Sequence, residues 1–173
     1  NIDIIIKSIP KVLAKVPEVV FVFKYNFGDL QPMMEALVKS LGVEKYVRFV
    51  GYLDDYGKLP AFYRMADVTV SILSSDSSGR AWFEAIASEA LLIENLVIGD
   101  KLWFVNNKNA LIVPLRNVEA TANAIIRLLT DKKLKQKIVD NAKCLVAEKA
   151  DYQKNMEKME QIYYQLASEY NKL

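Results

Sequence analysis

Apolar residues along this chain alternate between helix-like and strand-like spacing. Residues 1–16 place them three to four positions apart, which predicts a helix stopped by Pro17. The run over 19–23, Val-Val-Phe-Val-Phe, is continuously apolar, which predicts a strand covered on both faces. The helical spacing returns over 30–41 and ends at Gly42, a residue typical of helix ends.

The same alternation continues to about residue 130. Further strands are predicted at 47–50, 68–73, 91–93 and 110–113, with helices over 57–65, from about 80 to 87, and over 118–129, 132–146 and 152–170. Strands that alternate with helices are typical of an α/β fold, a mainly parallel sheet with helices on both faces. We expect the last three helices to pack on a core, including the tyrosines and methionines of 152–170, and of all the predicted elements these are the ones most able to reach beyond the domain.

Length, composition and net charge limit the kinds of protein that this chain can be. The chain has 173 residues, 52% of them hydrophobic, which is enough for one substantial core and favours a single domain over 1–173. The net charge of +2 is too weak to indicate a nucleic-acid partner. No apolar run approaches the roughly 20 residues that span a bilayer. We therefore expect a cytoplasmic protein, with membrane association in a longer protein as the alternative.

Residue types exclude several kinds of chemistry. The chain has no histidine, which excludes the usual zinc clusters and every histidine-based triad. Its one cysteine, Cys144, cannot form an internal disulfide. We expect no metal site and no cofactor. Any catalysis has to use carboxylates, lysine, arginine or hydroxyl groups.

The candidate chemistry lies between the predicted strand at 68–73 and the helix that follows. Six small polar residues, 74–79, connect them. In an α/β protein this connection sits where a strand's carboxyl end meets a helix's amino end, which favours an anion. Asp76 lies in this loop and Glu84 follows after seven intervening residues. That spacing is common by chance, so the position of the two acids carries the argument.

Several short motifs stand in the order found in a known family. These are Phe49-Val50-Gly51, Phe62-Tyr63, Ala66-Asp67-Val68, Ser74-Ser75-Asp76, Glu84-Ala85-Ile86-Ala87 and Asn107–Pro114. With them, nearly the whole chain resembles the C-terminal, nucleotide-sugar-binding half of family-four-like retaining glycosyltransferases (group 1, GT-B fold). The resemblance implies a Rossmann-like, doubly wound fold with extra C-terminal helices. It also implies transfer of a sugar from a UDP- or GDP-sugar to a glycan or lipid acceptor, as in polysaccharide biosynthesis.

The resemblance also implies roles for particular residues. Asp76 would contact the donor sugar and Glu84 the ribose hydroxyls, since carboxylates accept bonds from vicinal hydroxyls. Loop amides at the helix start would hold the diphosphate, and the loop after the strand at 47–50 would border the base. The residues concerned are Ser77, Ser78, Gly79 and Arg80 for the diphosphate, and Gly51, Tyr52 and Leu53 for the base.

The chain departs from the family pattern in identifiable places. The family's Glu-Gly-Phe-Gly is Asp76-Ser77-Ser78-Gly79 here, and its Gly-Lys-Pro after the helix is Glu89-Ala90-Leu91. The family's first strand, its phosphate-binding Arg and Lys and its N-terminal acceptor domain would lie upstream of Asn1. We therefore expect a fragment of a two-domain protein that binds a donor without turnover on its own. Arg80 could offset diphosphate charge in place of that pair, although an exposed arginine needs no function.

Other interpretations stay open at this point. A degenerate, non-catalytic binding or scaffolding module would have the same fold, and an epimerase or a phosphoacceptor signalling domain would share the architecture. Trp82 and Trp103 are interpreted as core or domain-interface residues rather than sugar platforms. The lysine-rich segment 132–137 favours a solvated helix start, with contact to acidic lipid as the alternative.

Overall fold

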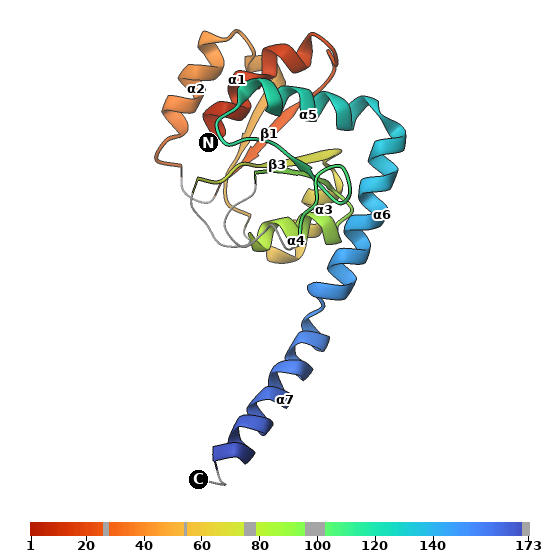
Figure 1. Cartoon of the computed structure of the whole chain (residues 1–173). Helices are drawn as coiled ribbons and strands as arrows, with labels where there is room; N and C mark the ends of the chain where they lie inside the picture. The colour runs from red at the N-terminus through yellow and green to blue at the C-terminus, as the bar shows by residue number, and fades with distance from the viewer. Residues whose placement is uncertain (26–27, 54, 75–78, 96–102, 171–173) are drawn as a thin grey trace.

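The computed structural model describes residues 1–25, 28–53, 55–74, 79–95 and 103–170 (Figure 1). The strands are β1 (Phe21–Lys24), β2 (Val47–Val50), β3 (Val68–Ser71), β4 (Leu91–Glu94) and β5 (Leu111–Ile112). The α-helices are α1 (Ile2–Leu13), α2 (Gln31–Ser40), α3 (Leu59–Arg64), α4 (Arg80–Ala87), α5 (Val118–Thr130), α6 (Lys132–Lys149) and α7 (Tyr152–Tyr170). Two 3₁₀ turns, η1 (Glu44–Tyr46) and η2 (Tyr56–Lys58), precede β2 and α3.

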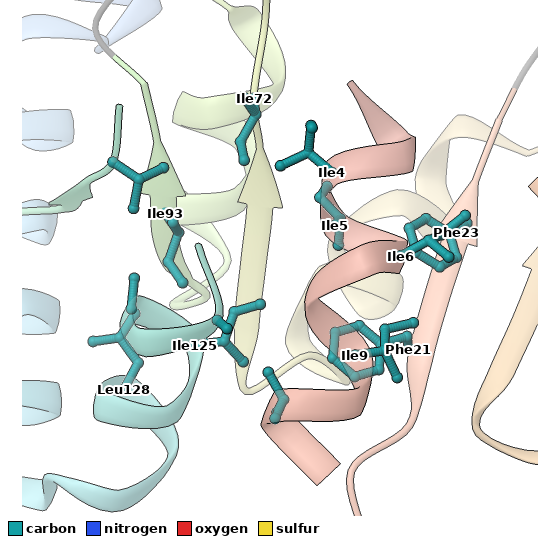
Figure 2. Packing of buried hydrophobic residues seen from close by; sticks show 14 of the residues in the cluster. Ile4, Ile5, Ile6, Ile9, Phe21, Phe23, Ile72, Ile93, Ile125 and Leu128 are labelled. Atoms are coloured by element: carbon teal, nitrogen blue, oxygen red, sulfur yellow. The ribbon is translucent and has the colours of Figure 1, made fainter. Parts of the chain in front are cut away.

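All described strand pairs are parallel, as predicted. β1 pairs with β2, and β3, β4 and β5 form a second group in that order. Apolar side chains of α1 join the two groups in one core: Ile6 and Ile9 lie by the phenylalanines of β1, and Ile4 and Ile5 lie toward Ile72 after β3 (Figure 2). The strands and helices therefore form one α/β unit.

The three-stranded group is covered on both faces, because alternate residues of β4 enter different clusters. Leu91 and Ile93 belong to the large core that α1 and α5 help to form. Leu92, between them, packs in a second cluster with Trp82 and Ile86 of α4 and Ala142 of α6. This is the two-sided burial expected of a continuously apolar strand in a doubly wound fold, and it places Trp82 in the core as predicted.

The prediction of two-sided burial is wrong for β1. Phe21 and Phe23 are buried, whereas Val20 and Val22 are 52% and 48% exposed. The strand therefore alternates, with one face on α1 and the core and the other face uncovered by the described residues. Phe23 stacks on Phe49 of β2, with ring centroids 5.5 Å apart. An apolar run reports that a strand forms, and the neighbouring elements decide how many faces they cover.

The expected core packing of 152–170 is also wrong. α7 has no buried residue, and Figure 1 shows it extending away from the rest of the molecule beyond α6. It is a separate helix because α6 ends at Lys149 and Asp151 starts a new helix, with its carboxylate accepting from the amide of Lys154 at 3.0 Å. The apolar stripe of α7 consequently has no partner among the described residues.

Helix boundaries otherwise follow local signals. Gly42 has the positive φ of +65° that ends α2 after Ser40. Asn117 and Asp131 cap α5 and α6 by accepting bonds from Ala120 and Leu134. α1 is shorter than the predicted helix over 1–16: it ends at Leu13.

Candidate functional site

The start of α4 is built around a glycine that lies on a tryptophan. Gly79 is the residue before α4, and a Cβ added to it would lie 3.1–3.2 Å from the indole of Trp82. Its φ of −69° suits any residue, so space and not backbone conformation favours glycine here. The backbone therefore comes close to the core at the point where α4 exposes its first N–H groups.

Two asparagines fix the chain just after β3. The Asn95 side chain, which follows β4, bonds both the amide and the carbonyl of Leu73, at 2.6 and 2.8 Å. Asn1 donates to the carbonyl of Ile72 at 3.1 Å and to the hydroxyl of Ser74 at 2.7 Å. Neither asparagine is among the site residues predicted from the sequence. A signal existed for Asn95, a polar residue directly after a buried strand at the ligand-binding edge of a parallel sheet.

Arg80 and Glu84 lie one turn apart on α4 and form an ion pair. Arg80 Nε is 3.2 Å from Glu84 Oε1. Arg80 Nη2 donates to the Tyr56 hydroxyl at 2.8 Å, and the guanidinium carbon lies 5.9 Å from the centre of that ring. Tyr56 belongs to η2, in the segment between β2 and α3. Its contact with Arg80 therefore ties this segment to the start of α4. Sequence reasoning missed Tyr56, because nothing in its local pattern indicates a contact 24 residues away.

Glu84 is the less exposed member of this ion pair. Its side chain is 28% exposed, against 79% for Arg80. Glu84 also acts on Tyr63 of α3: burial raises the pKa of the Tyr63 phenol, and the negative charge of Glu84 raises it further. Glu84 therefore presents a half-buried carboxylate beside the Arg80 cation, and its charge is felt by the Tyr63 phenol.

The predicted site residues fall into three groups. Gly79, Arg80 and Glu84 come together at the start of α4. Asp76, Ser77 and Ser78 lie outside the described residues. Gly51, Tyr52 and Leu53 follow β2 as expected, with Tyr52 exposed and Gly51 near the Tyr25 ring. In the described part of the segment between β2 and α3, Tyr56 contacts α4, through Arg80.

This arrangement suits an anionic ligand that also carries hydroxyl groups. Helix-start N–H groups and the Arg80 guanidinium favour a phosphate, and the Glu84 carboxylate can accept bonds from vicinal hydroxyls. In the part of the chain that the structure describes, no cluster of His, Cys, Asp or Glu could hold a metal ion. No helix in the same part is long and apolar enough to cross a membrane.

The parallel strands flanked by helices, with the candidate site at the start of α4, define a Rossmann-like α/β domain of the kind found in GT-B proteins. The family model for glycosyl transferases group 1 matches residues 1–144. The chain therefore belongs to the group 1 glycosyl transferase family.

Individual proteins are similar to this chain in sequence or in fold. An uncharacterized glycosyltransferase of Methanocaldococcus jannaschii is 28% identical over 98% of this chain and 42% of its own length. The C-terminal domain of the group 1 glycosyl transferase LpcC from Francisella tularensis is 25% identical, with a TM-score of 0.77 over 87% of this chain and 79% of that one. The pneumococcal O-GlcNAc transferase GtfA, solved with UDP and GlcNAc, has a TM-score of 0.81 at 19% identity, over 96% of this chain and 33% of that one. The chain spans less than half the length of the curated relatives it matches.

Proposed function

We propose that this chain is the nucleotide-sugar-binding domain of a retaining glycosyltransferase that transfers a hexose or related sugar from a UDP- or GDP-sugar to a glycan or lipid acceptor. The observation that carries the proposal is the placement of Gly79, Arg80 and Glu84 together at the start of α4. Family membership supports the reaction class, and UDP bound to the pneumococcal relative supports the donor class.

Each part of the donor has a proposed contact. The diphosphate lies at the start of α4, on the amides of Gly79 and Arg80 and of the preceding Ser77 and Ser78. Glu84 accepts bonds from the ribose hydroxyls. The sugar is contacted by Asp76, and the base is bordered by Gly51, Tyr52 and Leu53.

The acceptor is assigned to another part of the protein. Transfer needs donor, acceptor and groups that neutralise the departing nucleoside diphosphate, all held in position. Because the relatives are more than twice as long as this chain, we assign the acceptor to an N-terminal domain. The isolated domain then binds a donor without turning it over.

Calorimetric titration with UDP, GDP and their sugars tests the proposal. We expect one nucleotide series to bind. Glu84→Gln, which keeps the side chain's shape and removes its charge, should weaken binding about tenfold, the loss of roughly 1.4 kcal/mol. Glu157→Gln makes the same change on the exposed surface of α7 and should bind normally. Failure of both UDP and GDP to bind at millimolar concentration would contradict the proposal.

A further inference from the structure

Arg80 is held by two partners and still has donors to spare. A guanidinium carries five N–H donors. In the described part of the chain one edge, through Nε, faces Glu84, and Nη2 donates to Tyr56. The side chain is 79% exposed. A ligand at the start of α4 can therefore reach Nη1 and the free side of Nη2.

The two partners of Arg80 differ in charge and in the element that carries them. Tyr56 is neutral, and it lies on η2, where Asp55 accepts a hydrogen bond from the Gly57 amide at 2.8 Å. Glu84 is a carboxylate on the same helix as Arg80. Tyr56 can therefore hold the guanidinium in place without neutralising it, whereas Glu84 neutralises it.

The Arg80–Glu84 pair is easily given up. Ion pairs four residues apart on a helix contribute little to stability when one partner is as exposed to water as Arg80 is, because water screens them. A diphosphate carries more negative charge than a carboxylate and accepts two parallel bonds from a guanidinium. With both anions within its reach, Arg80 gains by moving its charged edge to the diphosphate.

We propose that Arg80 exchanges Glu84 for the donor's diphosphate while Tyr56 keeps hold of it, and that this exchange frees Glu84 for the ribose. The inference rests on the proposed function and adds to it a coupling between the two halves of the ligand. Arg80 is the diphosphate contact, and Tyr56 is a positioning residue that acts through Arg80.

The exchange has a signature that a purely structural role of Arg80 lacks. A nucleoside has no phosphate, so it must compete with Arg80 for Glu84. A nucleoside diphosphate removes that competition. Loss of Arg80 should therefore weaken binding of the nucleoside diphosphate and leave binding of the nucleoside at least as tight. A collapse of the site would weaken binding of both ligands.

The test measures binding of UDP and uridine, or of GDP and guanosine if the unaltered protein prefers guanine. Arg80→Gln should bind the diphosphate at least about tenfold more weakly and the nucleoside no more weakly than the unaltered protein. Arg127→Gln, the same change on α5, should alter neither. Equal diphosphate binding by Arg80→Gln, or equal weakening of both ligands, would overturn the exchange. If the unaltered protein binds neither UDP nor GDP, the proposed function fails, and the exchange fails with it.

A second variant tests Tyr56. Tyr56→Phe keeps the ring and removes the hydroxyl, and should weaken diphosphate binding about threefold. In the double variant Tyr56→Phe/Arg80→Gln the tyrosine change should add nothing, because Tyr56 acts through Arg80. Tyr164→Phe on α7 is the matched control. A full additional loss in the double variant would overturn the role of Tyr56.

Discussion

The side chain of Asn95 binds both backbone groups of Leu73. Its Nδ2 donates to the Leu73 carbonyl at 2.8 Å, and its Oδ1 accepts from the Leu73 amide at 2.6 Å. The two bonds continue the parallel β3–β4 pairing beyond its last pair, Ser71 with Glu94. The loop that leads to α4 therefore departs from a fixed point.

Asn95→Asp should destabilise the domain, because the buried side chain loses its donor and turns an anionic oxygen toward a carbonyl. We expect the free energy of unfolding to fall by about 2 kcal/mol and diphosphate binding to weaken with it. Urea denaturation measures the first and calorimetry the second. Asn155→Asp, at the exposed start of α7, should change neither. An unchanged unfolding midpoint for Asn95→Asp would show that this pairing is not made.

Gly79→Ala should disturb the start of α4, because the added methyl group meets the Trp82 indole at 3.1–3.2 Å. We expect a loss of about 1–2 kcal/mol in unfolding free energy, typical of overpacking. Adding Trp82→Phe, which shrinks the ring, should make the double variant more stable than the sum of the two single losses predicts. Strictly additive losses would mean that the two residues do not compete for space.

Glu89→Gly should stabilise the domain. Glu89 has a φ of +67° just after α4, where its amide bonds the carbonyl of Ile86 and the Ala90 amide bonds that of Ala85. This is a helix ending that favours glycine, and the left-handed conformation costs another residue about 1 kcal/mol.

The Glu89 prediction has a matched control, because Glu89 also pairs with Lys143 at 2.9 Å. Glu89→Ala loses that pair and keeps the positive φ, so it should be neutral or slightly destabilising. Glu89→Gly loses the same pair and relieves the backbone. Thermal unfolding should place the glycine variant above both the alanine variant and the unaltered chain. Equal stability of the glycine and alanine variants would contradict the prediction.

Removing α7 should leave the domain's stability almost unchanged. No residue of Tyr152–Tyr170 is buried, so a chain that ends at Ala150 keeps the described core. We expect the free energy of unfolding, measured by chemical denaturation, to change by no more than about 0.5 kcal/mol. The helical circular dichroism signal should fall, because a helix has been removed. A large loss of stability would show that the apolar stripe of α7 packs on this domain.

Periodicity predicted the elements well because each period reflects local geometry. The strand at 47–50 and the helix ending at Gly42 were predicted where they occur, since pattern and glycine conformation act within a few residues. The two wrong predictions, burial of both faces of β1 and core packing of α7, failed for one reason. Val22 and the apolar residues of α7 have the composition of buried positions, but burial depends on whether another element reaches them.

Sequence by itself determined the alternating α/β order, the motif from 74 to 87 and the family, because these follow from neighbours along the chain. Only the tertiary structure decided that Tyr56 meets Arg80 and that Asn95 holds Leu73, whereas the Arg80–Glu84 pair follows from its spacing on one helix. The two contacts between segments join residues 22 and 24 positions apart, and they arise from the way parallel strands bring their carboxyl ends to one edge. That convergence is a property of the packed sheet, and no local pattern records which side chains it brings together.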